Sequence, residues 1–95
     1  MTSNKTADRR AYDVRLATRV EAQLAALPAD VQRQLVRRLR GLALNPRPPA
    51  AEKLRGADLW RIKVSDYRAI YQIREHLLLV LVVKIGHRRD VYRSR

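Results

Sequence analysis

The 95-residue chain has no cysteine or phenylalanine and contains only three glycines. Without cysteine it can form neither a disulfide framework nor a zinc site built on thiolates. Gly41, Gly56 and Gly86 are too far apart in the sequence to form a glycine-rich, phosphate-binding loop. The longest apolar run, Leu77–Val83, is far shorter than a membrane span. The sequence therefore predicts one small domain with no membrane segment, suited to a reducing cytoplasm.

Acidic residues are also scarce. Asp and Glu number nine against 21 Lys and Arg, which gives a net charge of +12. We expect a domain with this charge to bind a polyanion, with nucleic acid as the first candidate and an acidic protein as the second. Residues 1–10 are polar and lack the apolar segment of a secretory signal. The predicted organisation is a disordered leader over residues 1–10 and one domain over residues 11–95.

Hydrophobic periodicity predicts the order strand, helix, helix and then three strands. The strands are expected over Ala11–Ala17, Leu59–Val64, Tyr67–Arg74 and Leu77–Ile85. Thr18 and Glu21 have the spacing of a capping box, which should start the first helix. Apolar residues at helical spacing mark the second helix: Val31, Leu35, Leu39 and Leu42. Arg47–Asp58 is expected to be a loop.

Short connections make the last three strands an antiparallel meander. The apolar stripes of the two helices must then cover one face of the sheet. We predict an α+β fold: a four-stranded antiparallel sheet with an N-terminal αα-hairpin packed on one face. The other face of the sheet should remain partly open.

Basic residues gather on this open face. A two-residue turn at Ser65-Asp66 places Lys63 directly opposite Arg68, and Arg61 points the same way. Two like charges facing each other destabilise a sheet, unless the side chains splay into water or an anion lies between them. Charge patterning alone allows both a solvated face and an anion site.

The extent of this face depends on the next turn. A two-residue turn at Glu75-His76 would place Arg68 opposite Val83, and Ile85 and His87 would then continue the open face. A second basic stripe, on the outer side of the second helix, consists of Arg33, Arg37 and Arg40. That stripe is either a solvated helix face or a secondary contact to a nucleic acid backbone.

Few catalytic chemistries remain. The sequence has no HExxH motif, carboxylate cluster or nucleophile elbow, so we expect no metal site and no cofactor. An RNA phosphodiester, however, carries its own nucleophile in the 2′-OH. Lys63 could accept a proton if desolvation and neighbouring cations lower its pKa, and His87 is the other candidate. Both residues are also compatible with structural or solvated roles.

The sequence resembles the RelE/ParE toxin superfamily, and most closely its RelE branch. The resemblance covers about Tyr12 to Tyr92. The segments that carry it are Lys53-Leu54-Arg55-Gly56, Leu59–Val64, Tyr67–Ile73 and Gly86-His87-Arg88-Arg89-Asp90-Val91-Tyr92. It implies the toxin of a type II toxin–antitoxin module, a ribosome-dependent endoribonuclease that inhibits translation by cutting mRNA in the A site without metal.

The resemblance also implies residue roles. Arg68 and a second arginine, Arg88 or alternatively Arg89, would hold the scissile phosphate. Lys63 would be a catalytic cation, and Tyr92 would orient the substrate base. Other predicted substrate-binding residues are Arg61, Arg89, Lys53 and Arg55. Arg61 stands where some members carry a lysine proposed as general base. Because Arg cannot accept a proton at neutral pH, Lys63 or His87 would have to do so here.

The implied partners are a cognate acidic antitoxin, mRNA and the ribosome, with operator DNA bound only through the antitoxin complex. Two alternatives stay open. One is a ParE-like poison of DNA gyrase without enzymatic activity, although that branch generally lacks the full cationic set and the C-terminal Tyr. The other is an inactive module that only binds an antitoxin, which the arginine at position 61 would allow.

Overall fold

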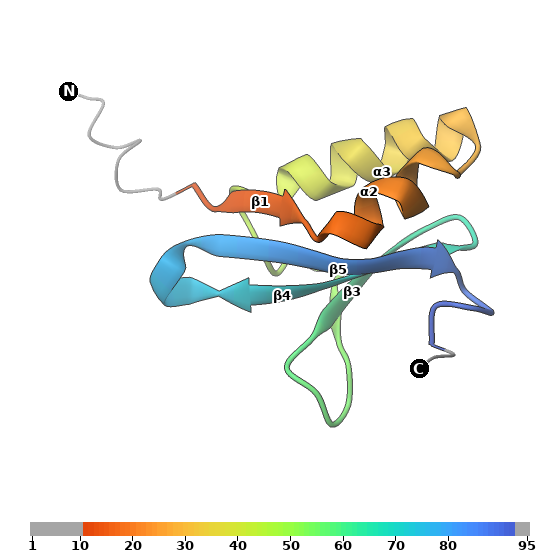
Figure 1. Cartoon of the computed structure of the whole chain (residues 1–95). Coiled ribbons are helices and arrows are strands. Elements are labelled where there is room, and N and C mark those ends of the chain that lie inside the picture. The colour runs from red at the N-terminus through yellow and green to blue at the C-terminus, as the bar shows by residue number, and fades with distance from the viewer. Residues whose placement is uncertain (1–10, 93–95) are drawn as a thin grey trace.

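The computed structural model describes residues 11–92, so the predicted leader and residues 93–95 lie outside the described part. Two helices lie on one face of a five-stranded sheet (Figure 1). The elements are β1 (Asp13–Leu16), α2 (Thr18–Ala25), α3 (Ala29–Gly41), β2 (Glu52–Lys53), β3 (Trp60–Val64), β4 (Tyr67–Arg74), the 3-10 turn η1 (Glu75–Leu77) and β5 (Leu79–His87). The predicted α+β class and helical hairpin are confirmed. Within residues 11–92, neither helix has the length and apolar character needed to cross a membrane.

The sheet differs from the predicted one in two respects. Its strand order is β1-β5-β4-β3-β2, and β1 runs parallel to β5 while the other neighbours are antiparallel. The fifth strand, β2, lies within the predicted loop and pairs with β3. Two residues are too short for a periodic signal. The direction of β1 depends on a partner distant in sequence, which local patterning does not report.

The core lies between the helices and the sheet. Val20 of α2 and Leu35 of α3 are fully buried there, together with Val80 and Val82 of β5. The predicted capping box at Thr18 was wrong, because the residue preceding the helix is Ala17 and no side chain caps it. Ala17 N–H still donates to Val82 O, at 2.9 Å. Sheet pairing therefore holds Ala17 extended, and the helix begins at the next residue.

The register between β3 and β4 is the predicted one. Lys63 pairs with Arg68, and Ser65-Asp66 forms the turn. Ser65 adopts a left-handed conformation with φ of 56°, which is uncommon for a residue other than glycine. The hairpin therefore keeps the two facing cations despite lacking glycine in its turn.

The predicted register between β4 and β5 was wrong. The connection is η1 followed by Leu78, whose φ is 50°, and it moves the partner of Arg74 to Leu79, two residues beyond the predicted one. A register shift between Ile70 and Tyr71 adds one more residue, so Arg68 opposes Gly86 instead of Val83. Ile85 consequently opposes Ala69 and belongs to the core, and His87 opposes Tyr67. Neither Ile85 nor His87 continues the open face.

The Tyr71 hydroxyl links the sheet to the segment after α3, and its burial predicts that the stability of the fold depends on pH. Its buried hydroxyl donates to Pro46 O at 2.7 Å, and burial raises its pKa to about 12. In the unfolded chain a tyrosine has a pKa of about 10. The unfolded state therefore releases this proton first, and stability present below about pH 10 is lost as pH rises towards 12. Two pKa units correspond to about 3 kcal/mol.

Replacing Tyr71 with Phe isolates this effect. The variant should be less stable by about 1–3 kcal/mol at neutral pH, because the Pro46 carbonyl loses its donor. It should also lose less stability than the wild type between pH 10 and pH 12. Urea unfolding at several pH values measures both quantities. If the free energy of unfolding fell equally steeply with pH in the two proteins over that interval, the pH dependence could not be assigned to Tyr71.

Candidate functional site

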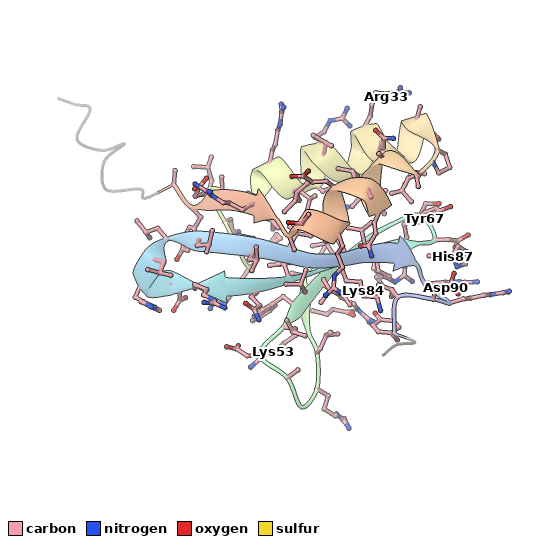
Figure 2. All side chains as sticks on the ribbon, in the orientation of Figure 1. Arg33, Lys53, Tyr67, Lys84, His87 and Asp90 are labelled. Atoms are coloured by element: carbon pink, nitrogen blue, oxygen red, sulfur yellow. The ribbon has the colours of Figure 1, made fainter. Side chains whose placement is uncertain are left out.

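On the face of the sheet opposite the helices, four basic side chains surround an apolar centre. One cross-strand row runs from Arg61 through Ile70 to Lys84, and the next runs from Lys63 through Arg68 to Gly86. Ile70 is only 5% exposed. Arg61, Lys63, Arg68 and Lys84 thus share one face and form what we call the cationic cluster. Figure 2 shows Lys84 on this side of the sheet.

Arg68 is fixed by the hairpin turn that precedes it. Its Nη1 donates to the carbonyl oxygens of Ser65 and Tyr67, at 3.3 and 3.1 Å. A guanidinium has five N–H donors, so these bonds orient the group while leaving donors for an anion. Lys63, the cross-strand neighbour, is exposed, and its own carbonyl accepts from Arg38 Nη1 at 3.2 Å.

The C-terminal turn folds back over the same face (Figure 1). Arg88 N–H donates to Asp66 O at 2.7 Å, and Val91 N–H donates to His87 O at 2.9 Å. Val91 is buried against Gly86, where an added Cβ would stand 3.8 Å from the Val91 Cβ. The turn therefore brings Arg88 close to the β3–β4 hairpin, with its Nε 3.8 Å from Asp66 Oδ1.

Arg61 connects the C-terminal turn with β2. Its Nε donates to Glu52 Oε1 at 2.8 Å, and its Nη1 donates to the hydroxyl of Tyr92. The hydrogen bond and charge of Arg61 hold the pKa of Glu52 below its ordinary value. The hydrogen bonds from Arg61 to Tyr92 and Glu52 raise the pKa of Arg61. Arg61 is therefore a permanent cation that cannot accept a proton.

Comparison with known proteins identifies the family to which the chain belongs. The family model described as "ParE toxin of type II toxin-antitoxin system, parDE" matches residues 14–92. A RelE-like toxin protein of Escherichia coli is 34% identical over 86 residues, which cover 85% of this chain and 90% of the relative. The chain belongs to the RelE/ParE family of type II toxin–antitoxin toxins.

Solved structures agree with the assignment of this chain to the RelE/ParE family of toxins. The isolated RelE toxin of E. coli is 32% identical, with a TM-score of 0.74, covering 90% of this chain and 89% of that structure. RelE in the archaeal RelE–RelB complex from Pyrococcus horikoshii OT3 is 26% identical, with a TM-score of 0.76, covering 85% and 99%. The resemblance inferred from sequence motifs is thereby confirmed at the level of the family.

His87 lies apart from the cationic cluster of this RelE/ParE-family toxin. Its ring packs edge-on against Tyr67 with 5.5 Å between centroids, and the register puts it on the Tyr67 side of the sheet (Figure 2). Its Nδ1 accepts from the backbone N–H of Arg89 at 3.1 Å. The arrangement gives His87 a role in shaping the C-terminal turn and places Lys63, not His87, beside Arg68.

The remaining predicted substrate-binding residues of the toxin surround the site without joining the cluster. Lys53 pairs with Trp60 and therefore lies on the opposite face of the sheet from Arg61. Arg55 belongs to the exposed loop between β2 and β3, where Gly56 has φ of 77°. Arg89 is exposed in the C-terminal turn. Within residues 11–92, His, Asp and Glu side chains form no group of three or more that could hold a metal ion.

Lys84 is the residue that sequence reasoning missed. It lies inside an apolar run, which predicts a strand buried on both faces. A register shift between Ile70 and Tyr71 lets Lys84 oppose Ile70 while Val82 opposes Tyr71. A bulge of this kind redirects side chains locally, and the only sequence signal for it is a lysine within the apolar run.

Proposed function

We propose that this toxin is an mRNA endonuclease that cuts in the ribosomal A site and so inhibits translation. The observation that carries the proposal is the facing pair Lys63 and Arg68, with Tyr92 linked through Arg61 to the same face. Facing like charges are unfavourable in a sheet, and a bound phosphate would relieve their repulsion. A cytoplasmic site of action follows from this substrate.

The reaction needs only groups that the substrate and the cationic cluster provide. The 2′-oxygen of the RNA attacks the adjacent phosphorus, and the bond from phosphorus to the 5′-oxygen breaks. The products are a 2′,3′-cyclic phosphate and a 5′-OH. In its neutral form Lys63 accepts the proton of the 2′-OH, and the ammonium so formed, or a water molecule, returns a proton to the leaving 5′-oxygen.

Electrostatic stabilisation of the transition state supplies the rest of the rate enhancement. Negative charge grows on the phosphate oxygens during attack, and preorganised cations stabilise that charge more strongly than water does. Arg68 is oriented by two carbonyl groups before substrate arrives. Arg88 approaches from the C-terminal turn, and Tyr92, 49% exposed, offers a ring to a substrate base.

The partner that restrains this activity is proposed to be a cognate acidic antitoxin. RelE of Pyrococcus horikoshii OT3 is found with its RelB partner in a solved complex. The net charge of +12 favours an acidic protein, and operator DNA would be bound only through the complex of both proteins.

Ribosome dependence is the first expected result. In a reconstituted translation reaction with a defined mRNA, primer extension should map new 5′ ends inside codons that occupy the A site. Without ribosomes, the same mRNA should remain intact at equal toxin concentration, because the cationic cluster binds RNA without aligning its 2′-OH. Cleavage of free mRNA at comparable rates would contradict the A-site proposal.

Gyrase poisoning is the second candidate, because the matching family model is that of ParE toxins. A gyrase supercoiling assay with purified toxin discriminates between the two. We expect full supercoiling activity in the presence of the toxin. Inhibition of gyrase by a preparation that leaves mRNA intact on ribosomes would establish the ParE-like function instead.

A further inference from the structure

Arg61 is held from two sides in the toxin. Glu52 accepts from its Nε at 2.8 Å and also from its Nη2, while Nη1 donates to the Tyr92 hydroxyl. The guanidinium carbon also lies 5.8 Å from the centroid of the Tyr92 ring, which is within cation–π range. Arg61 thus joins the two-residue strand β2 to the C-terminal turn.

Tyr92 needs such a partner to have a defined position. Val91 is 2% exposed and anchors the backbone of the turn, but the Tyr92 side chain is 49% exposed. A half-exposed ring samples several rotamers unless a contact selects one. The hydrogen bond and the ring contact with Arg61 select one here.

We propose that Glu52 is a positioning residue, which fixes Arg61 and through it the ring and hydroxyl of Tyr92 at the face that carries the Lys63 and Arg68 pair. The role in cleavage rests on the proposed function. Within residues 11–92, the hydrogen bonds of the Glu52 carboxylate are accepted from Arg61. It therefore acts through Arg61 and not on the substrate.

The proposal explains the arginine at position 61. A guanidinium is a planar fork that can bond a carboxylate on one side and a hydroxyl on another. A lysine ammonium is a compact donor on a flexible stem and holds no such fixed geometry. Arg61→Lys should consequently weaken the link to Tyr92 although it conserves the charge.

The first test needs no catalytic activity. We would compare wild type, Glu52→Gln and Glu75→Gln by NMR, following the Arg61 Nε–H exchange rate and the Tyr92 ring signals. Glu75 is a matched control because it also pairs with an arginine, Arg47, at 2.7 Å. We expect Glu52→Gln alone to speed Nε–H exchange about tenfold and to shift the Tyr92 signals. If the Nε–H exchange rate and the Tyr92 signals of Glu52→Gln were those of the wild type, the proposal would be overturned.

The second test measures cleavage on ribosomes. Glu52→Gln should lower kcat by about 10- to 100-fold, a loss typical of a misplaced group, with KM within about twofold. Tyr92→Phe should cause a similar loss, and the double variant should be no worse than either single one. Additive losses, or an equal loss in Glu75→Gln, would overturn the proposal. If the wild type cleaves no mRNA but Glu52→Gln shows the expected NMR changes, the proposed function is wrong. The conclusion that Glu52 fixes the position of Tyr92 is then retained.

Discussion

Arg68→Ala is expected to reduce ribosome-dependent mRNA cleavage by about 100- to 1,000-fold, the loss typical of removing one preorganised donor to a developing oxyanion. Arg68 is the member of the cationic cluster whose guanidinium is anchored by backbone carbonyls, at 3.1 and 3.3 Å. It therefore requires little reorganisation when charge develops on the phosphate. The measurement is the single-turnover rate on programmed ribosomes.

The same substitution should not destabilise the fold. Arg68 faces Lys63 across the hairpin, so alanine removes a like-charge contact that disfavours the folded state. We expect the free energy of unfolding to stay within about 1 kcal/mol of the wild type. Loss of cleavage with unchanged stability would show that Arg68 is needed for the reaction and not for the fold.

Arg74→Ala is the matched control for Arg68→Ala. Arg74 lies on the same strand and the same face, six positions along β4, and is exposed. At about 3.3 Å per residue it stands roughly 20 Å from Arg68. Its replacement removes the same charge, and cleavage should stay within about threefold of wild type. An equal loss in both variants would indicate general electrostatic attraction to the ribosome instead of a site at Arg68.

The β3–β4 hairpin shows what local sequence determines. Trp60, Ile62 and Val64 alternate with charged residues, and a two-residue turn then allows a single register. That register puts Lys63 opposite Arg68, as the structure has it. The central part of the candidate site could therefore be placed from sequence alone.

The β4–β5 connection shows what local sequence leaves open. The choice between a two-residue turn and a 3-10 turn ending at a left-handed Leu78 is not visible in side-chain periodicity, because the run after Glu75 is apolar on both faces. The connection moves the register by two residues, and the irregularity between Ile70 and Tyr71 moves it by one more. Because the total is odd beyond the irregularity, the two faces of β5 are exchanged there. His87 therefore moved away from the open face, and Lys84 moved onto it.

The contacts of Arg61 depend on tertiary packing. Glu52 belongs to a two-residue strand, and Tyr92 follows a turn that is held in place by burial of Val91 on Gly86. Neither feature has a periodic signal. The sequence could identify Arg61 as a departure from a lysine, but only the fold shows that its donors are directed to Glu52 and Tyr92.

Lys63→Arg is expected to be nearly as inactive as Lys63→Ala, with both rates lowered by about 100- to 10,000-fold, the range for loss of a general base. Arginine conserves the positive charge at this position but cannot accept a proton at neutral pH. The comparison therefore separates proton transfer from charge stabilisation. Near wild-type cleavage by Lys63→Arg would show that position 63 supplies charge only.

His87→Ala completes this argument, because His87 is the other side chain considered as a base. Its Nδ1 accepts from Arg89 N–H, and its ring packs on Tyr67 on the far side from Lys63. We expect this variant to keep cleavage within about tenfold, with any loss arising from a looser C-terminal turn. A loss as large as that of Lys63→Ala would instead assign the proton transfer to His87. Since Arg61 is a permanent cation bound to Glu52 and Tyr92, the proposed proton acceptance within the cationic cluster would fall to its lysines, and Lys63 is the one that directly faces Arg68.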